Sequence, residues 1–165
     1  MKVLFLDFDG VLNSAVWFRR RRDVCPKEKD TPEKRAMWAF DPDAIERLNQ
    51  VVERTGAKVV VSSTWRIGVA ALWAEIPVML SSRGFRGEVI GRTPYNLSSD
   101  EIIKGETRGT EIGVWLARNP GVEKFAIVDD DSDMGPLMPH LVHTSFETGM
   151  LDTHVEQLVV MLGEL

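Results

Sequence analysis

Cysteine is almost absent from this 165-residue sequence, because Cys25 is the only one. A single cysteine excludes an internal disulfide bond and a zinc site built from several cysteines. The histidines do not form a metal-binding set with Cys25, so we expect local hydrogen bonds for them; they are His140, His143 and His154. Any metal bound by this chain is therefore expected to have oxygen ligands.

Long apolar runs and nucleotide-binding motifs are also missing. No stretch approaches the roughly 18 uninterrupted apolar residues of a membrane span, and the opening letters MKVLFLDFDG place acids where a signal peptide needs an apolar run. We therefore expect a soluble, cytoplasmic protein with no membrane partner. The glycine motifs of P-loops and dinucleotide-binding folds are absent, so the sequence does not support the use of a nucleoside triphosphate.

The composition is that of one ordinary globular domain, which we expect to span residues 1–165. Hydrophobic residues make up 44% of the chain and charged residues 27%, and typical domains hold roughly 100 to 200 residues. The net charge of −5 hides an asymmetry. Residues 19–35 contain eight basic and four acidic residues, a local charge of +4, which leaves −9 for the rest of the chain.

Apolar segments and helix signals alternate along the chain. Strands are predicted at 2–6, 57–61, 76–80, 125–128 and 141–144, and helices between Asp41 and Gly56, at 67–75, at 108–118, as one turn at 133–138, and from Asp152 onward. The strand–helix–strand order predicts parallel crossovers. The predicted fold class is α/β, with a doubly wound and mainly parallel sheet.

Two long segments have no clean period. Residues 14–40 carry Pro26, Pro32 and many charges, so they are predicted to form a loop or small basic flap with about one helical turn. Residues 81–107 are rich in Gly, Ser, Pro and charge, and they are predicted to form a long loop with a short strand at 88–90. Loops of this length are often functional.

Polar residues follow three of the predicted strands. They are Asp7-Phe-Asp9-Gly10, Ser62-Ser63 and Asp129-Asp130-Asp131. Because ligands of open parallel sheets bind beyond the carboxyl ends of the strands, we expect these three sets to converge. Clustered carboxylates repel one another and persist only if they are protonated or bridged by a cation. Oxygen ligands favour Mg²⁺, so the sequence predicts a magnesium-dependent phosphoryl site.

The order and placement of these motifs resemble those of the haloacid dehalogenase-like (HAD) phosphatases. More narrowly, five segments are similar to the HAD domain of Swiss-army-knife RNA-repair proteins: DFDGVLN (7–13), VVSSTWR (60–66), RTP (92–94), RGTEIGVWL (108–116) and VDDDSDM (128–134). The resemblance covers nearly the whole chain. It implies a Rossmann-like three-layer sandwich and Mg²⁺-dependent hydrolysis of a phosphomonoester through an aspartyl-phosphate.

The resemblance also implies roles for the acids. Asp7 would attack phosphorus, while Asp9 would protonate the leaving oxygen and later activate water. The carboxylates of Asp7 and Asp129 and the main-chain carbonyl of Asp9 would hold Mg²⁺. Either Asp130 or Asp133 would help through a water molecule.

Other residues would bind the phosphate. Gly10 permits a tight turn near the phosphoryl oxygens. Ser62 is favoured as a hydrogen-bond donor by the strand phase, whereas Ser63 is the alternative and could instead cap the next helix. The third motif departs from the family pattern, which often has a lysine before the helix. Here Arg108 starts the helix and is favoured over Lys104, which lies in the preceding loop.

The short segments around the site leave little room for a cap domain, so we expect a capless enzyme with small flaps that admits a large substrate. Basic groups beside Trp17 and Phe18 suit single-stranded nucleic acid; they are Arg19, Arg20, Arg21 and Arg22. The hypothesis is a phosphatase of nucleic-acid ends, acting on 3′-phosphates, although such a run is more often a solvated flap. Arg66 is expected either to reach the substrate phosphate or to form a structural ion pair.

Two other functional classes remain open. A phosphoacceptor signalling domain also gathers acids over a parallel sheet, but it carries the accepting Asp after its middle strand, where this chain has Ser62. A non-catalytic nucleic-acid-binding module could use the basic flap alone. The sequence also leaves open whether the protein works with a separate kinase or ligase in the same pathway.

Overall fold

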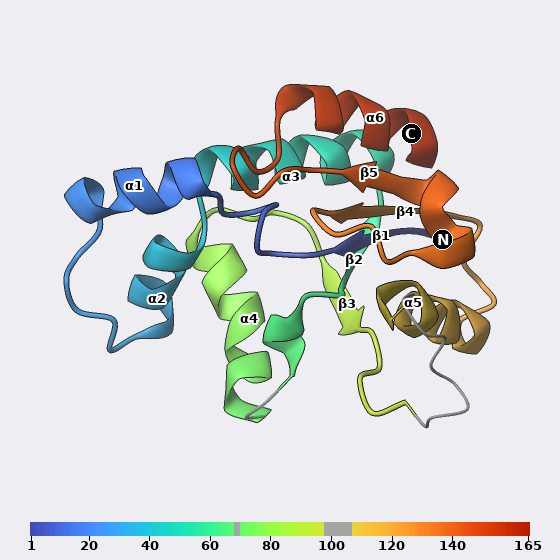
Figure 1. The fold of residues 1–165 in the computed structure, drawn as a ribbon, viewed down its shortest axis with the longest axis horizontal. Helices are drawn as coiled ribbons and strands as arrows, with labels where there is room; N and C mark the ends of the chain where they lie inside the picture. Colours follow the sequence, from blue (N-terminus) through green and yellow to red (C-terminus); the bar gives the residue numbers. More distant parts are fainter. Residues whose placement is uncertain (68–69, 98–106) are drawn as a thin grey trace.

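In the residues that the structure describes, 1–67, 70–97 and 107–165, five parallel strands form a sheet that helices cover on both faces (Figure 1). The structure is a computed structural model. The strands are β1 (Lys2–Leu6), β2 (Lys58–Val61), β3 (Val89–Arg92), β4 (Lys124–Asp129) and β5 (Leu141–His143), in the order β3-β2-β1-β4-β5. The predicted α/β class with a doubly wound parallel sheet is confirmed.

Helices lie between these strands and after the last of them. They are α1 (Ala15–Val24), α2 (Pro32–Ala39), α3 (Pro42–Thr55), α4 (Ala70–Ser82), α5 (Thr107–Arg118) and α6 (Asp152–Leu162), with short 3-10 turns η1 (Thr64–Arg66) and η2 (Gly135–His140). In Figure 1, α1 and α2 lie at one end of the molecule and both chain termini lie at the other. Among the described residues, no helix combines the length and the apolar character that a membrane span needs.

Alternate strand residues face opposite sides of the sheet, and each side has its own core. On one side, Val3, Phe5 and Val60 pack with Ile112 of α5. The other side packs against α3 and α6, and its buried residues include Leu4, Leu6, Val59, Ile45, Leu48, Val155 and Leu158. The sheet therefore lies between α5 and the pair formed by α3 and α6, which is the predicted three-layer arrangement.

Residues 14–40 form two helices, so the loop predicted there is wrong. Ser14 caps α1, because its hydroxyl accepts a hydrogen bond of 3.1 Å from the backbone N–H of Trp17. Thr31 caps α2 in the same way, and Pro32 follows at the first helical position. These helix-start signals are of the same kind as Asp41-Pro42, from which a helix was predicted. The helices at 14–40 were not predicted, because the many charged residues there hide the periodic spacing of the apolar residues. We call residues 14–40 the two-helix insert.

The run 76–80 is helical, so the strand predicted there is also wrong. The helix predicted at 67–75 continues through it as α4. Ile76, Met79 and Leu80 are buried at the i, i+3, i+4 spacing of one helix face, and a short apolar run does not distinguish that face from a buried strand. The third strand is instead β3, which lies close to the short strand predicted at 88–90. The other predicted elements lie within two residues of those observed.

Candidate active site

Three polar side chains lie side by side at the carboxyl ends of the central strands. In the parallel pairing of β1, β2 and β4, Leu6 lies opposite both Val61 and Val128. The residues that come next on these strands are Asp7, Ser62 and Asp129. Because alternate residues share a face with their neighbours in register, all three side chains emerge on the side of the sheet that α5 covers.

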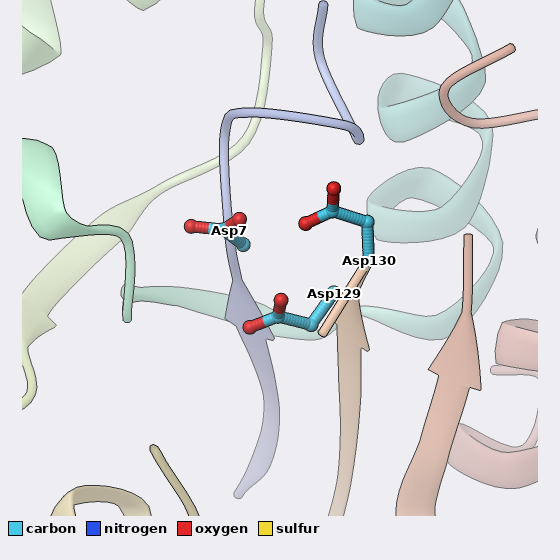
Figure 2. A group of neighbouring side chains, drawn as sticks. All are labelled: Asp7, Asp129 and Asp130. Atoms are coloured by element: carbon cyan, nitrogen blue, oxygen red, sulfur yellow. The ribbon is translucent and has the colours of Figure 1, made fainter. Parts of the chain in front are cut away.

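Asp7, Asp129 and Asp130 form a carboxylate cluster. One oxygen from each residue lies within 4.8 Å of those from the other two. Figure 2 shows the three groups around one space beyond the ends of β1 and β4. Asp7 and Asp129 are buried, and Asp130 is half-buried. The predicted convergence of acids from the two ends of the chain is therefore present in the fold.

Gly10 closes one side of this cluster. Its backbone has a φ of 72°, in the left-handed region that favours glycine. A Cβ atom at this position would lie 2.2 Å from Oδ2 of Asp130, which no side chain tolerates without displacing that carboxylate. Glycine here therefore serves both the turn and the close approach of the first loop to Asp130.

Arg108, at the start of α5, places its guanidinium against the carboxylate cluster. Its Nε atom lies 3.3 Å from Oδ2 of Asp129, and its Nη2 atom lies 3.8 Å from Oδ1 of Asp7. Two like unit charges 4.8 Å apart repel by about 3.5 kcal/mol at an effective dielectric constant of ~20. One guanidinium offsets only one of the three negative charges. The remaining charge of −2 matches a divalent cation.

Three buried polar atoms of the site have no hydrogen-bond partner within the described protein. They are Oγ of Ser62, Nη1 of Arg108 and Oδ2 of Asp129, whose 3.3 Å contact with Nε of Arg108 is an ion pair without hydrogen-bond geometry. Buried polar groups are nearly always hydrogen-bonded, so such a group marks a place where a ligand completes the site. The carboxylate oxygen suits a hard cation, and the hydroxyl and guanidinium N–H suit phosphate oxygens. The residues present therefore fit Mg²⁺ together with a phosphoryl group.

Burial raises the carboxyl pKa values of the cluster. The pKa of Asp7 is raised to about 6, mainly by desolvation, while Arg108 and a hydrogen bond from Ser63 act in the opposite direction. The pKa of Asp129 is raised to about 7 by desolvation and by the charge of Asp7. The pKa of Asp130 is also raised by desolvation. Without a cation, the folded protein thus retains protons here near neutral pH.

Two side chains hold the carboxylate of Asp9, and the sequence analysis assigned neither of them a role. The amide Nδ2 of Asn13 donates to Oδ1 at 2.8 Å, and the indole Nε1 of Trp65 donates to Oδ2 at 2.9 Å. Trp65 in turn packs against Phe8 and Phe40 with ring centroids 5.8 and 5.9 Å away. The carboxylate of Asp9 is thus fixed outside the cluster. The tryptophan three residues after Ser62 was the available signal.

Comparison with protein-family models assigns residues 3–155 to the HAD domain in Swiss Army Knife RNA repair proteins. The chain belongs to this family. No curated protein and no solved structure gave a significant match. The predicted family is confirmed, and membership supports a HAD-type phosphatase in general terms.

The metal-free HAD domain is expected to lose stability as the pH rises from 5 to 8. A carboxyl whose pKa is higher in the folded than in the unfolded state binds protons preferentially in the fold. The stabilisation is full below the unfolded value near 3.8 and is lost as the pH passes the folded values, about 6 for Asp7 and about 7 for Asp129. Asp7→Asn removes one such group. With chelator at pH 8 it should raise the Tm by roughly 6 to 12 °C, since the shift corresponds to about 3 kcal/mol.

Thermal unfolding of both proteins in EDTA at pH 5 and pH 8 measures this effect. The difference in Tm should be roughly half as large at pH 5 as at pH 8, because at pH 5 the unfolded carboxyl is already ionised while the folded one is still protonated. Mg²⁺ should raise the Tm of the wild type more at pH 8 than at pH 5. Equal Tm values for the two proteins at pH 8 in EDTA would contradict the burial of an ionised Asp7.

The two serines after β2 occupy different environments. Ser62 is fully buried with an unpartnered hydroxyl, next to Asp7 in the sheet. Ser63 caps η1, because its hydroxyl accepts a hydrogen bond of 3.3 Å from the backbone N–H of Trp65. Ser62 thus has the free hydroxyl that a phosphate contact requires. Ser63 caps the next helical turn, which is the role predicted for it if Ser62 binds the phosphate.

Arg66 does not face outward, and its geometry corresponds to the structural ion pair. Its Nη2 atom lies 2.6 Å from Oε2 of Glu111 on α5, with both side chains buried. The remaining N–H groups donate to main-chain carbonyl oxygens, those of Ser62, Ser63, Thr93 and Pro94. All five guanidinium donors are used, so of the two roles considered for Arg66 the geometry favours the structural ion pair over a contact with the substrate phosphate. Arg66 instead ties the loop after β2 to β3 and α5.

Asp133, in the loop after β4, contacts the first turn of α5 and lies outside the carboxylate cluster. Its Oδ2 atom accepts a hydrogen bond of 3.1 Å from the backbone N–H of Arg108, and its carbonyl oxygen accepts one from Gly109. Between the two acids expected to assist the metal, the geometry therefore favours Asp130. Lys104, the alternative for the third motif, lies outside the described residues.

The four arginines of α1 are not equivalent. Arg19 pairs with Glu147 at 2.8 Å, and Arg20 pairs with Asp43 at 3.5 Å. Exposed pairs of this kind contribute about 0 to 1 kcal/mol, so they leave both arginines available to a ligand. Arg21 donates to the carbonyl oxygen of Trp38 at 2.7 Å, and Arg22 is exposed. The basic run therefore lies on a helix and not on the predicted loop.

Proposed function

We propose that this HAD domain is a Mg²⁺-dependent phosphomonoesterase that acts through an aspartyl-phosphate on Asp7, with 3′-phosphorylated nucleic-acid ends as its substrates. The observation that carries the proposal is the carboxylate cluster of Asp7, Asp129 and Asp130, opposed by a single guanidinium. This arrangement suits a cation and a phosphoryl group in the same place. It also provides a nucleophile and a separate acid, Asp9.

The residues that would hold Mg²⁺ are Asp7 and Asp129 through their carboxylates and Asp9 through its main-chain carbonyl, with Asp130 acting through water. Bound Mg²⁺ would neutralise the developing negative charge on the phosphoryl oxygens and on the carboxylates. Arg108 and Ser62 would donate hydrogen bonds to the phosphoryl oxygens, since each has a buried donor without a partner.

The chain's own residues would carry two steps. In the first, a carboxylate oxygen of Asp7 forms a bond to phosphorus, the bond to the leaving oxygen breaks, and the proton on Asp9 passes to that oxygen. In the second, Asp9 takes a proton from water, the water oxygen bonds to phosphorus, and the bond to Asp7 breaks to release inorganic phosphate. Asn13 and Trp65 would keep the Asp9 carboxylate at a fixed position during both transfers.

The nucleic-acid part of the proposal rests on two supports. The family to which the chain belongs is that of RNA repair proteins. In addition, the +4 segment 19–35 lies in the two-helix insert, which follows directly after the Asp7 loop, and the insert carries Trp17, Phe18 and Trp38 on either side of that segment. Polyanionic single strands are bound by this combination of cations and stacking surfaces.

A panel of phosphomonoesters tests the proposal. It includes 3′- and 5′-phosphorylated DNA and RNA oligonucleotides and a small sugar phosphate, each assayed with Mg²⁺ and with EDTA. We expect at least tenfold higher kcat/KM for a 3′-phosphorylated strand than for the sugar phosphate, a decrease with salt, and no release of phosphate in EDTA. Equal rates on strand and sugar phosphate, with no salt dependence, would refute the nucleic-acid substrate.

A phosphoacceptor signalling domain is distinguished by turnover rather than by strand position. The sequence suggested that Ser62 follows the middle strand, where a signalling domain carries its accepting Asp. The central strand is instead β1, and the residue that follows it is Asp7, so strand position does not separate a signalling domain from a phosphatase. A signalling domain has no need of a positioned acid such as Asp9. Multiple turnovers on a phosphomonoester would exclude both this class and a non-catalytic binding module.

A further inference from the structure

A cavity of about 210 Å³ opens between the two-helix insert, η1 and α4. Trp38 and Trp65 contribute its aromatic surfaces, and Leu72 and Met79 of α4 its aliphatic surfaces. A cavity of about 150 Å³ is large enough to bind benzene, so this one accommodates a planar ring system but not a folded chain. The two tryptophans are half-buried.

The cavity adjoins the acid of the candidate active site through one side chain. Trp65 lines the cavity with its ring and donates its indole N–H to Oδ2 of Asp9 at 2.9 Å. In the proposed reaction Asp9 protonates the leaving oxygen, so whatever remains attached to that oxygen lies on the Asp9 side of the phosphoryl group. The cavity is therefore on the leaving-group side of the site.

Cations line the same cavity. Arg21, Lys29 and Arg35 contribute to its wall, and Arg35 is paired with Glu75 at 2.8 Å. Within the described part of the chain, neither Arg21 nor Lys29 has a carboxylate partner. Both approach the ring of Trp38, with the guanidinium carbon 5.1 Å and the ammonium nitrogen 4.2 Å from its centroid. Two positive charges therefore lie at an aromatic wall without an anion.

We propose that this cavity binds the 3′-terminal nucleoside of a nucleic-acid strand, with the base against Trp38 and Trp65 and the 5′-phosphodiester of that nucleoside against Arg21 and Lys29. The inference rests on the proposed function, because it takes the nucleoside as the leaving group. Bases stack both on aromatic rings and on guanidinium planes, and the phosphodiester supplies the anion that the two cations lack. The proposal assigns this role to Arg21 and not to Arg19 or Arg20, which pair with acids outside the cavity.

Equilibrium binding in EDTA tests the cavity apart from catalysis. The probes are adenosine, adenosine 5′-monophosphate and a trinucleotide with a free 3′-hydroxyl, titrated into the full chain and followed by calorimetry and tryptophan fluorescence. Both phosphate-bearing probes are expected to bind at least tenfold more tightly than adenosine and to quench fluorescence, with affinity falling as salt increases. Equal binding of adenosine and its 5′-monophosphate would overturn the proposal, and so would failure of the trinucleotide to bind.

The double variant Arg21→Gln/Lys29→Gln should weaken trinucleotide binding at least tenfold, whereas Arg118→Gln, at an exposed arginine of α5 outside the two-helix insert, should change it less than twofold. Lys29→Gln alone changes an exposed side chain and should weaken binding at least threefold. It keeps the test valid if the double variant misfolds. Unchanged binding in both variants would overturn the proposal.

The outcome is separable from that of the proposed function. Asp7→Asn should bind the trinucleotide as the wild type does. Nucleotide binding without turnover would support the cavity and refute the phosphatase, whereas Mg²⁺-dependent turnover without nucleotide binding would do the reverse.

Discussion

Asp7→Asn is expected to reduce phosphomonoester hydrolysis by about 10⁴-fold or more at saturating Mg²⁺. The amide is nearly isosteric with the carboxylate, but it neither forms an acyl-phosphate nor provides the negative charge that the cluster offers to a cation. The loss should appear in kcat. Since removing a buried carboxylate with a raised pKa stabilises the metal-free fold, loss of activity should accompany a higher Tm at pH 8 and not a lower one.

Asp131→Asn is the matched control. Asp131 belongs to the same acidic run, but it is exposed and lies outside the carboxylate cluster. This variant should retain activity within about threefold. Fluoroberyllate, an analogue of the phosphoryl group on an aspartate, should bind the wild type in the presence of Mg²⁺ and should not bind Asp7→Asn. Turnover in Asp7→Asn at a tenth of the wild-type rate or more would assign the nucleophile elsewhere.

Arg108→Ala should lower kcat by about 10² to 10³-fold, the usual cost of removing one positioned donor to a developing anion. The guanidinium contacts Asp129 and Asp7 and has a buried Nη1 atom without a partner, which a phosphoryl oxygen would complete. Arg108→Lys keeps the charge but loses the planar pair of donors, so it should recover only part of the activity. The readout is kcat and KM on one small phosphomonoester, with the Tm as a check of folding.

Two further variants make this result specific. Arg118→Ala removes an exposed arginine at the other end of α5 and should leave kcat within about twofold. Lys104→Ala tests the alternative residue for the third motif. If Lys104→Ala lost as much activity as Arg108→Ala, both residues would serve the phosphate. If Arg108→Ala alone had no effect, the assignment of the third motif to Arg108 would be wrong.

Local patterns predicted most of the sheet correctly because its strands are buried on both faces. The apolar runs at 2–6, 57–61 and 125–128 are short and end in polar residues, and each became a strand. The similar run at 76–80 became a helix, since a run of five residues does not reveal which neighbours will bury it. The two-helix insert was missed for the opposite reason, because charge dominates its composition and its packing depends on Trp17 and on residues of α4.

The family, the α/β class and the acids at the ends of the strands were all predicted from the sequence. These follow from short-range signals, because an apolar run that ends in Asp or Ser positions the polar group at the edge of a parallel sheet. Which acids share one space was decided only by the tertiary structure. The register of the strands places Asp129 beside Asp7. Asp133 instead accepts a hydrogen bond from the backbone N–H of Arg108 at the start of α5, outside the carboxylate cluster.

The tertiary structure also decided which cations face the site. Arg66 and Arg108 are both buried, but five acceptors occupy Arg66, whereas Arg108 retains an unpartnered donor beside the cluster. The contact between Trp65 and Asp9 likewise joins residues from two different strand ends. The sequence specifies which side chains are charged and which are apolar. The role of a charged side chain also depends on its desolvation and on the groups that pair with it, and both arise only when distant segments of the chain pack together.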